Sequence, residues 1–546
     1  MRKMNMNLKM FSFVFVAFFV GVGFNSAPNH EKYFEISKNI EIFTNLYKEI
    51  NTYYVDDVDP AKLMRTGVDA MLESLDPYTN YISESEIEGF RYITEGKYNG
   101  IGALFRKIDG KIMITEPWEG QPAQKAGLKA GDVITEIDGK STSGKSTEDV
   151  SNILKGYPGT EVVMTIQRYG ESKTRKVTLV RDEVSVPNVP YSGMIADGIG
   201  YVALTTFTRN AGKNVGDAVK QLKEENPDMK GVVFDLRGNG GGLLTEAVNV
   251  SNVFIPKNEL VVTTKGKVKD WDRSFKTLNR AVDEEIPLVV LINNGSASAS
   301  EIVSGVMQDM DRGVLMGQRS YGKGLVQNTR DVGYNSKVKL TTAKYYIPSG
   351  RCIQSVKYDG GEPLDIPDAE RTPFKTKAGR KVLDGGGVKP DVAIGEDDQE
   401  RIIKSLKGKH LIFQFVTEYV STISTMDDVS EFKFNDFDKF VQFLADKNYS
   451  YESASEKLLK DLMKKAKEEK YKLDSELDVI SNKITEVKKN DIMKHEKVLT
   501  NLIEKEIAAR YEYNKGKIKM GLRNDEEIKS AVELLNDRAK YDSLLK

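Results

Sequence analysis

Two stretches near the middle of the chain each run from an uninterrupted apolar segment through a turn of small residues into a helical pattern. "KGVVFDLRGNGGG" is followed by "LLTEAVNVSNVFI", and "IPLVVLINNG" is followed by "SASEIVSGVMQDM". Short apolar runs bounded by glycine are typical of buried strands, and their alternation with helices favours a layered α/β domain.

The chain is too long for that domain alone. At 546 residues it exceeds the size at which a single hydrophobic core stops growing. Helical patterns lie before residue 76 and beyond residue 400, and short β-rich runs with glycine turns lie between 96 and 183. The expected parts are a signal peptide or membrane anchor (1–27), an N-terminal helical region (31–95), a β-rich domain (96–184), the α/β domain (185–398) and a C-terminal helical region (399–546).

The two ends of the chain carry different signals. A basic segment, "MRKMNMNLK", precedes the apolar run "MFSFVFVAFFVGVGF", which is short for a full membrane span. We expect export, with residues 10–24 either removed as a signal or retained as an anchor. Residues 453–546 are strongly charged, with sparse apolar positions at helical spacing, which predicts a solvated helical appendage, alone or paired with a partner or a second copy.

Three serines alternate with alanine in "NNGSASASEI", at positions 296, 298 and 300. A strand that ends at Ile292 and a helix that begins near Ala299 would place Ser298 at the helix N-terminus, where free N–H groups and the helix dipole stabilise negative charge. The same residues form the capping-box pattern S-x-x-E, which needs no catalysis. A nucleophile and a structural cap are both consistent with this stretch.

A base for such a serine is not a histidine. The chain has 3 histidines, and none lies between residues 31 and 409. Lys323 lies between Gly322 and Gly324, with Gln327 four residues further on. A buried lysine amine acts as a base near neutral pH once its pKa falls about three units below 10.4. The alternative is an ordinary surface lysine.

The turn "DLRGNGGG" resembles a nucleotide-binding loop only superficially. A G-x-G-x-x-G pattern that starts at Gly238 would need glycine at position 243, which is Leu243. Consecutive glycines do suit backbone N–H groups that point at an oxyanion.

Several motifs in a fixed order carry a resemblance to a known family. In the β-rich part, "GIGA", "AQKAGL" and "GDVI" resemble a PDZ domain. Together with "SLDPYTNYI", "DLRGNGGG", "NNGSASASEI", "SYGKGLVQ", "KLTTAKYYIPSGRCIQ" and "GVKPDV", they resemble the C-terminal (tail-specific) processing peptidases, serine peptidase family S41, over residues 60–395. The resemblance implies a multidomain fold of α/β and α+β parts: a crotonase/ClpP-like α/β peptidase core, a PDZ domain, and N- and C-terminal helical regions.

The resemblance also implies roles for individual residues. Ser298 matches the nucleophile, Lys323 the base and Gln327 the amide that orients the base. Backbone N–H groups of Ala299 and Gly241 match the oxyanion hole, with Gly242 as the alternative to Gly241.

The PDZ resemblance implies how a substrate is chosen, because a PDZ fold adds the extended C-terminus of a partner as a strand and binds its carboxylate with loop N–H groups. The matching positions are Gly100, Ile101 and Gly102 in the loop, and Val150, Ile153 and Leu154 on the following helix.

The sequence therefore predicts an exported serine endopeptidase of the periplasm or cell envelope that recognises protein C-terminal tails. No cofactor or metal is expected. The net charge of -1 gives no attraction to nucleic acid, and 1 cysteine excludes an intrachain disulfide. Partners would be protein substrates, an adaptor, or a second copy bound through the C-terminal helices.

Two alternative functions are a scaffolding protein without catalysis and a small-molecule-binding relative of the same fold. The presence of Ser298, Lys323 and Gln327 together argues against the scaffolding protein. The PDZ-like region argues against the small-molecule-binding relative.

Overall fold

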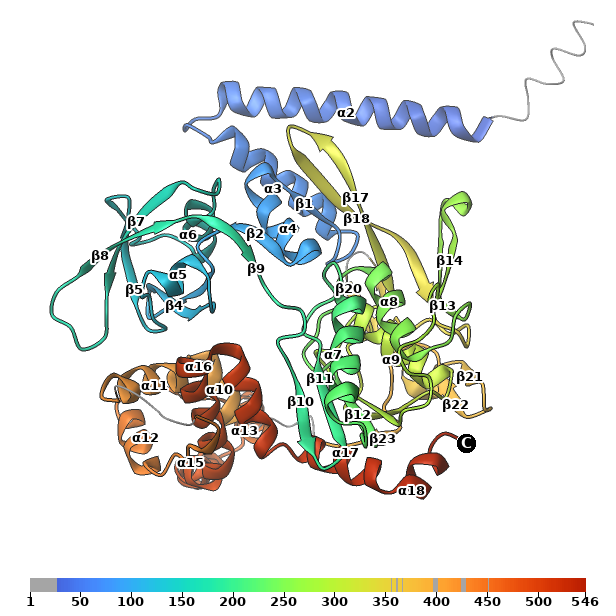
Figure 1. Cartoon of the computed structure of the whole chain (residues 1–546). Coiled ribbons are helices and arrows are strands. Elements are labelled where there is room, and N and C mark those ends of the chain that lie inside the picture. The colour runs from blue at the N-terminus through green and yellow to red at the C-terminus, as the bar shows by residue number, and fades with distance from the viewer. Residues whose placement is uncertain are drawn as a thin grey trace, which may run out of the picture. The chain divides into compact units, whose positions relative to one another are not determined.

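The computed structural model describes residues 27–354, 356–359, 362–365, 367–395, 401–423, 429–449 and 451–546 (Figure 1). The expected signal or anchor, residues 1–27, lies outside these ranges apart from Ala27. The chain divides into two compact units, Met1–Tyr81 and Ile82–Lys546. None of the helices in the described ranges is both long enough and apolar enough to cross a membrane.

From residue 27 onward, the first unit contains the helices α2 (Ala27–Tyr53) and α3 (Pro60–Glu73). Helix α3 begins after Asp59, whose carboxylate accepts hydrogen bonds from the N–H groups of Ala61 and Lys62. Proline at the first helical position needs no such partner, because it has no N–H to satisfy. The short strand β1 (Asn80–Ile82) lies where the first unit ends.

The β-rich part of the second unit forms the PDZ-like sheet, in the order β3-β4-β5-β7-β8. Its hairpin turn at Asp109 and Gly110, both with positive φ, connects β3 to β4. Apolar side chains from these strands and from α6 form one core. The elements are α4 (Ile87–Glu95), β2 (Lys97–Gly100), β3 (Ala103–Ile108), β4 (Lys111–Pro117), α5 (Pro122–Lys125), β5 (Val133–Ile137), β6 (Lys140–Ser141), α6 (Thr147–Leu154), β7 (Glu161–Gln167), β8 (Arg175–Val180) and β9 (Asp182–Ser185).

The α/β part contains a six-stranded sheet, in the order β10-β11-β12-β15-β16-β23, that is parallel except for the β10–β11 pair. The predicted strand–turn–helix order is present at both glycine- and serine-rich turns. Helices α7, α8 and α9 pack on one face of the sheet through a large apolar core. The bounds are β10 (Tyr191–Ala196), β11 (Ile199–Ala203), α7 (Ala211–Glu225), β12 (Gly231–Asp235), α8 (Leu244–Phe254), β15 (Leu288–Ile292), α9 (Ala299–Asp309), β16 (Val314–Gly317) and β23 (Val392–Ala393).

The other face of the sheet is covered by the C-terminal helices α17 (Glu526–Asn536) and α18 (Arg538–Ser543), not by a segment close in sequence. Alternate residues of the strands, such as Val233 and Leu291, pack against Ile528 and Leu535 in this second core. The solvated appendage expected for residues 453–546 is therefore only part of their structure, because their last two helices complete the α/β layer.

Antiparallel strands β13 (Leu260–Gly266), β14 (Arg273–Lys276), β17 (Leu325–Gly333) and β18 (Ser336–Tyr346) form a second sheet beside the core. Short pairs are formed by β19 (Val356–Asp359) with β20 (Glu362–Asp365), and by β21 (Pro373–Lys375) with β22 (Lys381–Leu383).

The remaining helices form a cluster with its own apolar core, rich in phenylalanine. They are α10 (Arg401–Gly408), α11 (Leu411–Ser421), α12 (Phe437–Leu444), α13 (Ala454–Glu468), α14 (Asp474–Lys489), α15 (Asp491–Lys494) and α16 (Glu496–Arg523).

Candidate active site

A cleft of about 570 Å³ brings the predicted catalytic residues together. Its walls come from the glycine turn before α8, the start of α9, the start of β17 and helix α4. Ser298, Ala299, Lys323, Gln327 and Gly241 all line it. Residues that lie 86 positions apart along the chain, from 241 to 327, thus face one cavity.

The backbone distinguishes Ser298 from its two neighbours. Ser298 has φ 56 and ψ -112 at the N-terminus of α9, a conformation that a non-glycine residue holds only when its surroundings impose it. Its side chain is half-buried and faces the cleft. Such a strained strand-to-helix turn is typical of exposed nucleophiles.

Ser296 and Ser300 are structural. Both are fully buried, and their hydroxyl groups donate to the carbonyls of Leu236 at 2.8 Å and Asn239 at 2.7 Å. These bonds tie the serine turn to the glycine turn. Of the three alternating serines, Ser298 is the one whose side chain lines the cleft.

Glu301, in the first turn of α9, connects the serine turn to the lysine loop. Its Oε2 accepts hydrogen bonds from the backbone N–H groups of Ser298 and Lys323, each at 2.8 Å. Its Oε1 accepts from Ser320 Oγ and from the N–H of Gly322, each at 2.6 Å. Complete burial raises the pKa of Glu301 to about 7, although these four donors act in the opposite direction.

Tyr345 of β18 connects the same two loops from the other side. Its hydroxyl donates to the carbonyl of Lys323 and lies 3.1 Å from the carbonyl of Ser298. The ring is almost completely buried, so the hydroxyl is held in place by packing. The backbones that carry Ser298 and Lys323 are therefore connected twice, through Glu301 and through Tyr345.

Lys323 lies in the loop two residues before β17 and Gln327 lies within β17, and both are half-buried. Gln327 Nε2 donates to Thr341 Oγ1 at 3.2 Å, which fixes the amide by its nitrogen end. Next to Lys323, Gly324 donates its N–H to Gln354 Oε1 at 2.7 Å. A Cβ at position 324 would lie 2.7 Å from the backbone nitrogen of Gln354, so only glycine lets the loop pack this closely.

The glycine turn touches the serine turn through Gly241. A Cβ at this position would lie 2.7 Å from the carbonyl oxygen of Ala297 and 2.9 Å from the nitrogen of Ala299. The position requires glycine for two reasons: a Cβ would collide with these atoms, and its φ of +97 is one that other residues rarely adopt. The N–H of Gly241 donates to Asn239 Oδ1 at 2.9 Å. The oxyanion role predicted for Gly241 stays a prediction, and it would require this N–H to turn from Asn239 to the substrate.

The glycine turn is anchored by ion pairs to the C-terminal helices. Arg237 contacts Asp235 at 2.6 Å and Asp525 at 2.8 Å, and it also pairs with Glu527. Burial acts to lower the pKa of Arg237, but these three carboxylates raise it above its ordinary value. The start of α17 thus holds the first residues of the glycine turn.

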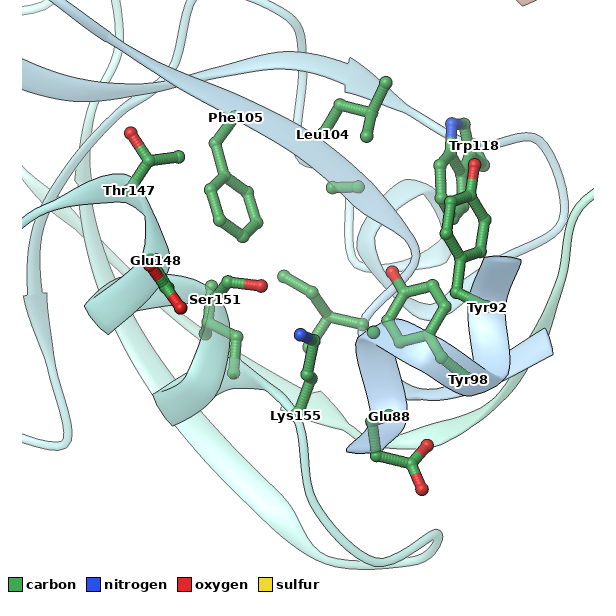
Figure 2. Close-up of a pocket in the computed structure, with 14 residues that line it drawn as sticks. Glu88, Tyr92, Tyr98, Leu104, Phe105, Trp118, Thr147, Glu148, Ser151 and Lys155 are labelled. Carbon is green, nitrogen blue, oxygen red and sulfur yellow. The ribbon is translucent and has the colours of Figure 1, made fainter. Parts of the chain in front are cut away.

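A second cavity, a groove of about 290 Å³, lies in the PDZ-like part between β3 and α6 (Figure 2). Of the six predicted peptide-binding residues, Ile101 and Leu154 line it. Gly100 and Gly102 belong to the loop at its end. Val150 is fully buried in the domain core, and Ile153 is 37% exposed and is not among the lining residues. The α6 side is formed by Thr147, Glu148, Ser151, Leu154 and Lys155.

Helix α4 forms a wall of both cavities. Glu88, Gly89 and Tyr92 line the PDZ groove, whereas Phe90, Ile93 and Thr94 line the catalytic cleft. A helix of nine residues presents successive side chains around its whole circumference, which allows one short helix to serve both.

Glu301, Tyr345 and Asp525 are residues of the site that were not predicted from sequence patterns. A signal existed for Glu301, since the S-x-x-E pattern that predicts a cap also places a carboxylate beside the serine. Tyr345 lies in the strand "KLTTAKYY" with no local mark of its role, and Asp525 lies 288 positions from Arg237.

Three protein-family models match parts of the chain. Residues 198–361 match the model of peptidase family S41, residues 113–168 match a PDZ domain, and residues 402–535 match the "Probable PDZ-protease, C-terminal helical domain".

The chain is 36% identical over 369 residues to a carboxy-terminal-processing protease of Bartonella bacilliformis, covering 67% of this chain and 81% of that protein. It is 31% identical over 434 residues to a probable CtpA-like serine protease of Staphylococcus aureus, covering 77% and 84%. Among solved structures, the photosystem II D1 C-terminal processing protease is 27% identical with a TM-score of 0.35, covering 67% of this chain and 96% of that one. The chain therefore belongs to peptidase family S41, as a serine-type C-terminal processing peptidase with a PDZ domain and a C-terminal helical domain.

Proposed function

We propose that the protein is an exported endopeptidase that binds the C-terminal tail of a protein substrate in its PDZ groove and cleaves the chain with a Ser298–Lys323 dyad. The observation that carries the proposal is the strained backbone of Ser298 in a cleft that also contains Lys323 and Gln327. The other two serines of the turn are engaged in buried hydrogen bonds to the glycine turn.

In the first step, the neutral amine of Lys323 takes the proton of Ser298 Oγ as this oxygen attacks the carbonyl carbon of the scissile peptide bond. The carbonyl oxygen becomes an oxyanion. The N–H of Ala299, at the N-terminus of α9, and an N–H of the glycine turn would stabilise it. The Gln327 amide oxygen would orient the Lys323 amine, because its nitrogen end is held by Thr341.

The tetrahedral intermediate collapses when Lys323 returns the proton to the leaving nitrogen, and an acyl-enzyme on Ser298 remains. Lys323 then takes a proton from water, whose oxygen attacks the ester carbon, and the proton returns to Ser298 Oγ. The carboxylate product leaves, and both residues are restored.

The test is cleavage of an unfolded protein with an apolar C-terminal tail. We expect Ser298→Ala and Lys323→Ala to lose nearly all activity, and Gln327→Ala to retain a reduced rate. Quenching wild-type enzyme and substrate in acid should give a covalent adduct on the Ser298 peptide by mass spectrometry. A Ser298→Ala or Lys323→Ala variant that cleaves at the wild-type rate would disprove the dyad.

Tail recognition is tested separately, by amidating the terminal carboxylate of the substrate. If the PDZ loop binds that carboxylate, amidation weakens cleavage through a higher KM. Equal KM values for the two substrates would refute this part of the proposal and leave the dyad standing.

Export is supported by the basic and apolar N-terminal segments. The mass of the mature N-terminus in fractionated cells distinguishes a cleaved signal from an anchor retained in the membrane. A protein found intact in the cytosolic fraction would contradict export to the periplasm or cell envelope.

A further inference from the structure

The loop at the end of the PDZ groove has a fixed orientation. The carbonyl of Ile101 accepts from the N–H of Ala123 at 2.7 Å, and the carbonyl of Gly102 accepts from the N–H of Trp118 at 2.9 Å. In a planar trans peptide the carbonyl and the following N–H point in opposite directions. The N–H groups of Gly102 and Ala103 therefore point away from the domain interior. This outward side is the one on which a terminal carboxylate would bind.

The side chain of Tyr98 already occupies this position. Its hydroxyl oxygen lies 3.2 Å from the nitrogen of Gly102 and accepts its hydrogen bond. Burial raises the pKa of Tyr98 to about 12, so the acceptor is a neutral phenol near neutral pH.

Packing holds Tyr98 there. Its ring makes edge contacts with Tyr92 of α4 and with Trp118, at centroid distances of 5.9 and 5.8 Å. A Cβ at Gly100 would lie 2.6 Å from the ring, which shows how closely it is pressed against the loop. Figure 2 shows these three aromatic side chains grouped at one end of the groove, with Phe105, Thr147 and Ser151 toward the other.

We propose that Tyr98 is an internal competitor for the carboxylate-binding loop and thereby sets how tightly C-terminal tails bind. A tail binds fully only when its carboxylate replaces the phenol oxygen on the N–H of Gly102. A charged acceptor makes a stronger hydrogen bond than a neutral one, so a carboxylate can win this exchange, whereas an internal backbone carbonyl or a C-terminal amide gains nothing from it. The inference rests on the proposed role of the groove in tail recognition.

Tyr98→Phe removes the competing oxygen and keeps the aromatic packing. We expect this variant to bind a free-acid peptide about tenfold more tightly, since one modest hydrogen bond no longer has to be broken. The same peptide with a C-terminal amide should also bind more tightly, because its carbonyl oxygen can accept from the freed N–H, and the preference for the acid should remain.

The experiment measures both peptides, with an apolar C-terminal residue, by fluorescence anisotropy on the full chain carrying Ser298→Ala to prevent cleavage. Tyr157→Phe is the matched control, since Tyr157 lies in the same domain, is 83% exposed and is not among the residues that line the groove. The readouts are the acid Kd, which reports the competition, and the ratio of the amide Kd to the acid Kd, which reports recognition of the carboxylate. Tyr98→Leu, which also lacks the hydroxyl, gives the same comparison if the phenylalanine variant does not fold.

The outcomes separate the two proposals. An acid Kd that falls about tenfold in Tyr98→Phe and stays at the parent value in Tyr157→Phe, with the acid preferred over the amide, supports the inference. An acid Kd that does not fall in Tyr98→Phe, with the acid still preferred over the amide, overturns the inference and leaves tail recognition intact. Equal binding of acid and amide by all variants overturns both.

Discussion

Glu301 and Lys323 are joined by a hydrogen bond of 2.8 Å, from the backbone N–H of Lys323 to Oε2 of the glutamate. The same oxygen accepts from the N–H of Ser298, also at 2.8 Å. One buried carboxylate thus fixes the relative position of the two main-chain segments that carry the proposed nucleophile and its base. Positioning of this kind is what an alkoxide attack needs, because a displacement of about 1 Å can cost about 100-fold in rate.

We expect Glu301→Gln to lower kcat/KM by about 100-fold and to destabilise the α/β part by about 2 kcal/mol. The amide keeps the size of the side chain but replaces one acceptor with a donor, which then faces two N–H groups. Steady-state kinetics and urea unfolding measure the two effects. Glu284→Gln, at an exposed position, is the control and should change neither.

Glu301 also predicts a pH dependence of stability. Its pKa is about 7 in the folded protein, against 4.5 for an ordinary glutamate, so the folded state binds more protons between these values. This contribution to the free energy of unfolding is fully present below pH 4.5 and is lost as the pH rises to about 7, a total of about 3 kcal/mol. Urea unfolding at several pH values should show this component in the wild type and not in Glu301→Gln; parallel curves would contradict the assignment.

Tyr345→Phe should reduce kcat by about tenfold with little change in KM. The variant loses the hydroxyl that holds the carbonyls of Lys323 and Ser298, at a cost of about 1 kcal/mol, while the ring still fills the core. Peptide binding to the PDZ groove is the internal control. A variant with wild-type kcat would show that Glu301 alone is sufficient to align the two loops.

The pair Asp525→Asn and Glu527→Gln should lower activity although both residues lie in the C-terminal helical region. Removing both carboxylates leaves the mostly buried Arg237 with Asp235, and the glycine turn that follows Arg237 loses part of its support. Asparagine preserves the cap that Asp525 provides to α17. Glu526→Gln, exposed and paired with Lys529, is the matched control and should retain full kcat/KM.

The sequence predicted the elements well where local pattern determines structure. The apolar runs before Gly238 and Gly295 form strands of one sheet, and the helices follow as expected. The pattern and the family resemblance both selected Ser298, but the spacing does not show why Ser296 and Ser300 are structural, because that distinction lies in one backbone torsion and in buried hydrogen bonds.

Two other features of the structure could not be predicted from local sequence pattern either. Apolar spacing on α6 identifies the face that packs in the core, as at Val150, whereas the groove face carries Thr147 and Ser151. Likewise, Ile528 and Leu535 mark α17 as amphipathic, but nothing local indicates that its partner is a sheet formed by residues 199–317. Long-range packing partners are not encoded in helical periodicity.

The cover of the sheet by α17 and α18 has a consequence for the order of events during synthesis. Leu288 exchanges backbone hydrogen bonds with the hydroxyl of Tyr541, 253 positions later, and the strand face beneath it stays open until that segment has emerged. The PDZ-like sheet closes over much shorter distances, so a growing chain would gain its recognition module well before its peptidase core. We therefore expect peptidase activity to appear only once the last two helices have been made.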